Sequence, residues 1–408
     1  MSTATGGVGV DRGELAQKAR QAPVRRFAQL GAAAAGVGAA IFLWALASGR
    51  ADRAWQAYHT NFVFWTALAQ AAVVFAATQK LAKGHWSGLV IRFAEAAVGF
   101  LFVALALFVG LFLGRDHIFS WIHEPRPDIG SWLTTKWFFL RDGAVLAVLA
   151  WLSWRFVRHD LAPDIQELSD GTPVEVDPNG KGVITREAAI LVLGYAFGYS
   201  LLAFDLIMSL AHKWVSNLFG AFYFMGSFLA ALSGTAVMSL ALRRAMGLEH
   251  LISGKQLHDL GKLVFGFTVF WAYLMFSQFL VIWYGNLPEE TWFIFYRLYG
   301  PWRPVGVAVF CLVFLIPFIG LLGVRPKRHP PTFLAFALVS FTGIWLERYL
   351  EVVPSINGGA GPAIGVPEIG LTLFFGGLFL LAYGWFAARY PMISPRLAAD
   401  TLERERPH

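Results

Sequence analysis

Ten apolar blocks, each about 17 to 26 residues long, leave this chain few ways to fold. A run of ~18 or more apolar residues can cross the ~30 Å hydrocarbon core of a bilayer as a helix. Lipid cannot satisfy open backbone groups, so a helix is the form such a block takes. The blocks lie at 27–47, 58–79, 90–113, 141–157, 187–210, 217–242, 260–283, 302–323, 331–350 and 368–388. The sequence therefore predicts an all-α polytopic membrane protein with about ten transmembrane helices.

The basic residues predict the orientation of these spans. If both ends and the loops after spans 2, 4, 6 and 8 share one side, that side holds 23 Lys and Arg and the other holds 10, out of 33 in all. The positive-inside rule then places both termini in the cytoplasm. Because the basic residues lie between apolar blocks, the net charge of +7 indicates a topology signal and no nucleic-acid partner.

The same count divides the chain into a cytoplasmic N-terminal segment (1–26), a transmembrane domain (27–388) and a cytoplasmic C-terminal tail (389–408). The loop at 159–186 contains a candidate hairpin, 174–184, with two short strands around a Pro178-Asn179-Gly180 turn. Short links between helices suggest two four-helix bundles, spans 2–5 and 6–9, with spans 1 and 10 outside them. Glycines in span 10 would allow a neighbouring helix to approach closely.

Few residue types here could hold a redox cofactor. The single cysteine, Cys311, argues against a disulfide framework, a Cys-ligated zinc site and a self-contained iron–sulfur cluster. The ten histidines lie at or beyond the ends of the spans, which argues against a haem within the bilayer. We therefore expect no cofactor and no metal in this chain.

Ionisable residues inside a membrane span are costly and suggest a partner or a purpose. Toward the outer side these candidates are His59, Asp142, Asp205, His212 and Glu347; toward the cytoplasm they are Glu95, His258, Asp259 and Lys262; and polar residues near the middle include Tyr273, Ser277 and Gln278. They are candidates for a proton path or a quinone site.

Four of these candidates have a structural alternative. Asp205 has no neutralising neighbour within its own span, so it is either a relay or head-group ligand or a structural acid capped by an arginine from another span. Glu95 follows Arg92 by three residues, where an intrahelical ion pair is available. His258 and Asp259 could simply form a solvated helix start.

Three stretches resemble a known family. The first runs from Asp205-Leu206-Ile207-Met208-Ser209-Leu210 through His212-Lys213-Trp214 to Gly220-Ala221-Phe222-Tyr223-Phe224-Met225-Gly226-Ser227. The second joins His258-Asp259-Leu260-Gly261-Lys262-Leu263 to Phe270-Trp271-Ala272-Tyr273, Ser277-Gln278-Phe279 and Asn286-Leu287-Pro288-Glu289-Glu290. The third is Trp345-Leu346-Glu347-Arg348-Tyr349. Together they resemble the F subunits of bacterial alternative complex III, a quinol:electron-acceptor oxidoreductase, within the polysulfide-reductase type of membrane subunits.

The resemblance implies a cofactor-free subunit of the bacterial cytoplasmic membrane that scaffolds a quinol:cytochrome c (or other acceptor) oxidoreductase and could conduct protons. Haem c and iron–sulfur clusters would lie in partner subunits, and quinol would bind within the complex. The implied partners are a sister ten-helix membrane subunit, an iron–sulfur subunit, multihaem cytochrome c subunits, small membrane subunits and, in some complexes, a terminal oxidase. As an integral membrane protein the chain would also contact lipid.

Two other functions stay open at this level. The chain could have its own quinone site near the outer face, between spans 2–5. It could instead be a stand-alone secondary transporter, a class that typically shows paired helices broken by Gly or Pro near the midplane. Pro317 is the only proline well inside a predicted span, and it has no evident counterpart.

Overall fold

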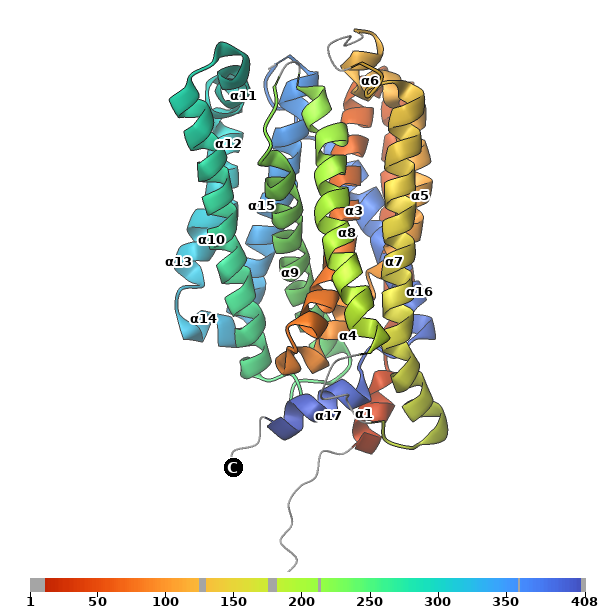
Figure 1. Ribbon diagram of the computed structural model, residues 1–408. Helices are drawn as coiled ribbons and strands as arrows, with labels where there is room; N and C mark the ends of the chain where they lie inside the picture. Colours follow the sequence, from red (N-terminus) through yellow and green to blue (C-terminus); the bar gives the residue numbers. More distant parts are fainter. Residues whose placement is uncertain (1–11, 125–129, 175–181, 212–213, 359, 405–408) are drawn as a thin grey trace, which may run out of the picture.

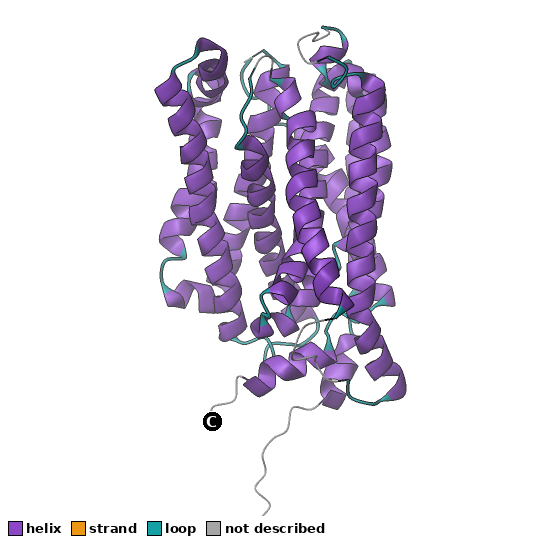
Figure 2. Cartoon of the chain, in the orientation of Figure 1, coloured by secondary structure: helices purple, strands orange, loops and turns teal. Residues whose placement is uncertain are grey.

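A computed structural model describes residues 12–124, 130–174, 182–211, 214–358 and 360–404. Its described residues form helices and connecting loops, without strands (Figure 2). Ten helical segments are long and apolar enough to cross a membrane, which confirms the predicted fold class. These are α2 (Val24–Ala47), α3 (Ala51–Leu81), α4 with α5 (Ile91–Glu95, Val98–Leu113), α7 (Thr135–Asp170), α8 (Val183–Leu206), α9 (Phe219–Ala245), α10 (Gly254–Gly285), α12 with η6 and α13 (Arg303–Phe310, Cys311–Leu315, Ile316–Gly320), α15 (Pro330–Ile356) and α16 (Val366–Arg389).

The spans form two side-by-side bundles, as predicted (Figure 1). In the first bundle α3, α5, α7 and α8 pack in a ring, and in the second bundle α9, α10, η6 with α13, and α15 do the same. The bundles meet where α3 contacts α9 and α15, and where α8 contacts α9. Helix α3 is therefore almost wholly enclosed, although its sequence is no more apolar than that of its neighbours.

Spans 1 and 10 form a pair outside the two bundles. Glycines of α2 and α16 allow this contact, because a Cβ at Gly38 would lie 2.4 Å from the Phe374 backbone nitrogen and one at Gly377 would lie 2.4 Å from the Ala35 nitrogen. Small residues at such spacing allow close backbone approach in membranes. The prediction for the span-10 glycines is confirmed at Gly377.

Short helices cap both ends of the molecule. Helices α1 (Arg12–Ala19) and α17 (Pro395–Arg404) lie together at one end, here called the α17 end. Helices α6 (Arg115–Ile118) and α11 (Pro288–Leu298) lie at the opposite end, here called the α11 end (Figure 1). The predicted C-terminal tail thus contains a helix that packs against α1, α7 and η1 (His85–Leu89).

Helix α7 differs most from its predicted span. It begins at Thr135 rather than Arg141 and continues to Asp170, well beyond residue 157. The predicted loop therefore starts later, and Val183 and Ile184 of the candidate hairpin begin α8, while residues 175–181 lie outside the described part. A run of apolar residues ends at the first charged residue. The helix itself can continue beyond that point where other protein groups pair with its charged side chains.

Pro317 lies in span 8, directly after a turn of π-helix at Cys311–Leu315. Proline offers no backbone N–H to the preceding turn, and π-turns commonly accommodate such a defect. Prolines also lie inside α7 (Pro163) and α15 (Pro354), near the ends of helices that extend beyond the predicted spans.

Candidate functional site

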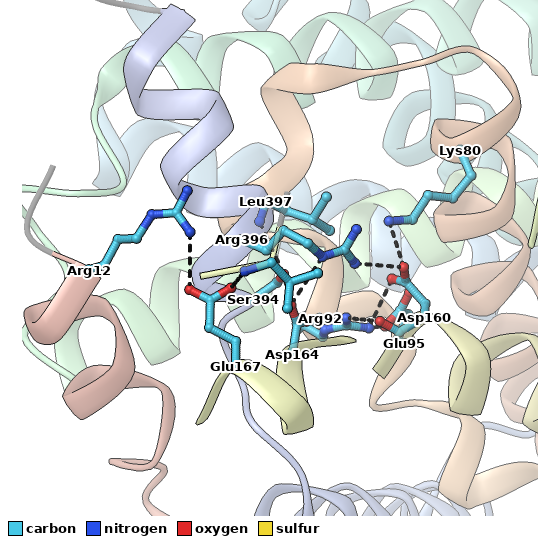
Figure 3. A network of polar contacts seen from close by, with 11 residues as sticks. Arg12, Lys80, Arg92, Glu95, Asp160, Asp164, Glu167, Ser394, Arg396 and Leu397 are labelled. Carbon is cyan, nitrogen blue, oxygen red and sulfur yellow. Dashed lines mark hydrogen bonds and ion pairs between the residues drawn. The ribbon is translucent and has the colours of Figure 1, made fainter. Parts of the chain in front are cut away.

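At the α17 end of the first bundle, six ionisable side chains form one buried network, here called the inner cluster (Figure 3). It contains three cations and three acids contributed by α3, α4, α7 and the segment at α17: Lys80, Arg92, Glu95, Asp160, Asp164 and Arg396. Because the charges balance, the cluster can lie in a low-dielectric interior without an uncompensated ion.

Arg92 is the centre of the inner cluster and is fully buried. Its guanidinium pairs with the carboxylates of Glu95 and Asp164, lies 3.0 Å from Oδ2 of Asp160, and donates to the Asp160 carbonyl at 2.7 Å. The predicted Arg92–Glu95 pair is therefore confirmed. Glu95 Oε1 has no hydrogen-bond donor among the described residues.

Two of the acids come from the extension of α7 that the apolar pattern did not predict. Asp160, Asp164 and Glu167 follow one another at helical spacing, so they lie on one face of α7. Arg12 of α1 lies 3.3 Å from Glu167, and Ser394 donates to Asp164 at 2.7 Å. The extension of α7 is thus held by both terminal segments.

At the α11 end of the first bundle, a second group forms the outer cluster: His59, Trp132, Arg141, Asp142 and Asp205. Arg141 donates to Oδ2 of Asp205 at 2.8 Å through Nε and at 2.5 Å through Nη2, and Trp132 donates to Oδ1 at 2.8 Å. Of the two interpretations of Asp205, the structure shows the arginine-capped acid. The cap comes from α7, at a residue expected to mark the start of span 4.

Asp142, the second acid of the outer cluster, differs from Asp205 in its hydrogen bonding. It is fully buried, and neither carboxylate oxygen has a hydrogen-bond donor within the described chain. The Nε of Arg141 lies 3.6 Å away, but that group is directed to Asp205. Arg141 thus serves one of two neighbouring acids, and the burial of the other acid is not offset by a hydrogen bond.

His59 was expected at the start of span 2, but it lies two turns inside α3 and is fully buried. Its Nε2–H donates to the Leu206 carbonyl at 2.7 Å, and its ring packs edge-on against Phe119. This bond leaves Nδ1 as an acceptor, which finds no donor in the described ranges. His212, the other histidine predicted here, lies outside the described residues.

Several polar side chains lie between the two clusters in the interior of the first bundle. The Gln70 amide donates to Ser153 Oγ at 2.7 Å, and Tyr199 donates to the Thr66 carbonyl at 3.1 Å. The Thr66 hydroxyl is buried without a described partner. All of these residues are enclosed, so they provide hydroxyl and amide groups between the two charged ends.

The second bundle has a different interior, with a cavity of about 430 Å³ toward the α11 end. Its walls are mainly aromatic and aliphatic side chains of α9, α10, α11, α12 and α15. Four polar side chains also line it: Gln278, Arg297, Glu347 and Glu351. A mostly apolar cavity with a few polar groups is typical of a small-molecule site.

Each of these four polar side chains has an atom without a hydrogen-bond partner among the described residues: Gln278 Oε1, Arg297 Nε, Glu351 Oε1 and Glu347 Oε2, the last of which lies 3.5 Å from Arg348 Nη2. Two of the side chains are held through their other oxygen. Trp271 donates to Glu347 Oε1 at 2.5 Å, and Arg348 donates to Glu351 Oε2 at 2.5 Å. The cavity is therefore a preformed, acceptor-rich site whose two acids are already fixed in place.

The remaining predicted residues belong neither to the two charged clusters nor to the cavity of the second bundle. Tyr273 is 61% exposed on the outer face of α10, and Ser277 is not among the cavity-lining residues. Asp259 pairs with Lys262 at 2.6 Å and lies 3.9 Å from His258, at the start of α10. This is the solvated helix start that was the alternative for these residues.

Several residues in the sites were not among the sequence candidates. These are Lys80, Asp160, Asp164 and Arg396 in the inner cluster, Trp132 in the outer cluster, and Trp271 and Arg297 at the cavity. The spacing of Asp160, Asp164 and Glu167 was a usable signal, since three acids on one helical face predict a basic partner. Nothing in the local sequence pointed to Arg396.

The described residues contain no group of three or more His, Cys, Asp and Glu side chains placed to hold a metal ion. No protein-family model and no curated protein sequence matches this chain.

Proposed function

We propose that this chain is a cofactor-free membrane subunit of a bacterial quinol-oxidising respiratory complex, and that its first bundle conducts protons. The resemblance of residues 205–227, 258–290 and 345–349 to the F subunits of alternative complex III supports the assignment. The charge asymmetry supports a cytoplasmic-membrane orientation with the α17 end in the cytoplasm. Haem and iron–sulfur subunits would then cover the α11 end.

The observation that carries the proton route is the buried carboxyl of Asp142, whose ionised form accepts no hydrogen bond within the described chain. A relay group must exist with and without its proton, so a carboxylate that no described hydrogen bond stabilises is suited to take up a proton. Buried acids in membrane helices commonly mark such relays. His59 Nδ1 is a second unpartnered acceptor at the same end of the described bundle. Thr66, Gln70 and Ser153 lie between this end and Glu95.

The test is the Asp142→Asn variant in the purified complex, reconstituted in vesicles with quinol and an electron acceptor. Proton translocation should fall by about a hundredfold, the lower end for a positioned proton-transfer group. The control is Glu289→Gln on α11, an acid that lines none of these sites. Wild-type proton translocation in Asp142→Asn would refute the route.

The cavity in the second bundle supports a second candidate function, binding of quinol by this chain. A quinol carries an apolar tail and two hydroxyl donors, which suit the aromatic walls and the oxygens of Glu347, Glu351 and Gln278 that accept no hydrogen bond within the described chain. The volume of about 430 Å³ lies in the usual range for ligand sites. This candidate quinone site lies in spans 6–9, whereas the sequence pattern suggested spans 2–5.

A photoreactive quinone analogue can test this second candidate in the intact complex. Labelled peptides should come from α10 and α15, and Glu347→Gln should reduce the labelling. Tyr273→Phe is the matched control, because Tyr273 lies on α10 but faces away from the cavity. Labelling confined to another subunit would contradict quinol binding by this chain.

A further inference from the structure

A third cavity, of about 320 Å³, lies at the α17 end of the first bundle. Its walls come from the end of α3, from η1, α7, the start of α8, and α17. Five ionisable lining residues matter here: Lys80, His85, Asp160, Arg396 and Asp400. Three of them belong to the inner cluster, so this cavity reaches the buried charges directly.

The exposed fraction of the lining side chains falls steadily into the cavity. It is 38% for His85, 14% for Lys80 and 1% for Asp160. His85 Nδ1 lies 2.7 Å from Asp400 Oδ2 at the rim, and Lys80 Nζ lies 2.8 Å from Asp160 Oδ1 at the bottom. The His85–Asp400 contact and the Lys80–Asp160 ion pair thus mark the two ends of a passage from the surface to Asp160.

The size and polarity of this cavity suit water. One water molecule occupies ~30 Å³ in the liquid and needs two to four polar partners in a protein. The cavity has room for several, and its lining offers ammonium, imidazole, guanidinium and carboxylate groups. A chain of water molecules there would connect the rim with Asp160.

Terminal segments close another side of the inner cluster. Ser394 donates to Asp164 at 2.7 Å, and the backbone N–H of Met392 donates to the Ala19 carbonyl at 3.0 Å. Arg12 of α1 covers Glu167. The two terminal segments therefore cover one side of the inner cluster, and the cavity gives access to it from another side.

We propose, resting on the proton route above, that this polar cavity is the cytoplasmic proton entrance and that the His85–Asp400 pair loads it. An imidazole can accept a proton at one ring nitrogen and donate one from the other, and His85 lies at the solvent-exposed rim. The charged groups facing this rim are Lys80 from α3, Lys83 beside η1, His159 and Asp160 from α7, and Arg396, Asp400 and Arg404 from α17.

The first test is His85→Ala in the reconstituted complex. Proton uptake from the cytoplasmic side should slow by about tenfold, less than a positioned group usually contributes, because water in the cavity offers a parallel path. Imidazole added on that side should restore uptake, which a purely structural loss would not allow. The control is His258→Ala, at the same end but outside the cavity.

The outcomes separate the two proposals. If the wild-type complex moves no protons, the proton route itself fails. If the wild type moves protons and His85→Ala takes them up at the same rate, the entrance is refuted while the route stands.

The second test measures access of water without turnover. In a Cys311→Ser background, Ile184→Cys lines the cavity and Val264→Cys is fully buried in α10. A membrane-impermeant thiol reagent should modify Ile184→Cys from the cytoplasmic side and leave Val264→Cys unmodified. Equal protection of both cysteines would show that the cavity is closed to water and would overturn the entrance.

Discussion

The two charged clusters of the first bundle are built from similar residues but differ in balance. In the inner cluster Lys80, Arg92 and Arg396 match three acids. In the outer cluster Arg141 is shared unequally between two acids and is directed to Asp205. The inner cluster links α3, α4, α7 and α17 through its ion pairs. The outer cluster contains one acid whose carboxylate has no hydrogen-bond partner in the described chain.

This difference distinguishes charged residues that stabilise the fold from charged residues that could move protons. Removing a charge from a balanced buried network leaves its partner uncompensated, which is costly. Removing the charge of an acid that has no partner costs little, so such an acid is kept for another reason. Stability and proton movement should therefore respond to different residues, and four measurements test this.

The largest loss of stability is expected for Arg92→Met. The change leaves three buried acids with two cations, and breaking a buried pair typically costs ~3–5 kcal/mol. Thermal unfolding in detergent would measure it. Lys262→Met is the control, because this side chain is 58% exposed in a surface pair worth ~0–1 kcal/mol. Equal melting temperatures for the two variants would contradict the structural role of the inner cluster.

A smaller loss is expected for Arg141→Met. The change leaves Asp205 without its cation. Because Arg141 is 19% exposed and Trp132 still donates to Asp205, we expect the free energy of unfolding to fall by about 2–3 kcal/mol. Adding Asp205→Asn should recover part of this loss, because the two residues are directly coupled. Strictly additive losses in the same unfolding experiment would mean that the pair is not an energetic unit.

Asp142→Asn should change stability by less than about 1 kcal/mol, or raise it slightly, since the carboxylate that it replaces accepts no hydrogen bond within the described chain. Its proton translocation should still be lost. A loss of stability close to that of Arg92→Met would reveal a partner for Asp142 and remove the contrast between the clusters.

The smallest effect concerns the docking of α17 in acid. Partial burial alone would raise the pKa of Asp400, but hydrogen bonds from Arg404 and His85 outweigh it and lower this pKa. A depressed pKa stabilises the folded form above the ordinary carboxyl pKa of about 4, and this contribution disappears as pH falls through the lower, folded value.

Hydrogen exchange of the α17 amides should therefore accelerate on acidification below about pH 4, relative to the intrinsic rate. Asp400→Asn is the control and should lose that part of the pH dependence. An identical acid response in both proteins would show that Asp400 does not hold the helix.

The sequence by itself determined the number of spans, because an apolar helix is the form that lipid accepts. The short links between helices only suggested the grouping into two bundles, which the contacts between helices then showed. The sequence also predicted the Arg92–Glu95 pair, since residues three apart on a helix are neighbours.

Only the tertiary structure decided which charges meet. Asp205 has its partner 64 residues away on α7, and Asp164 is reached by Arg396 from 232 residues away. The cavity polar groups come from α10, α11 and α15. Helical spacing fixes neighbours within one helix, but the pairing between helices depends on their rotation and depth, which packing of the whole bundle sets.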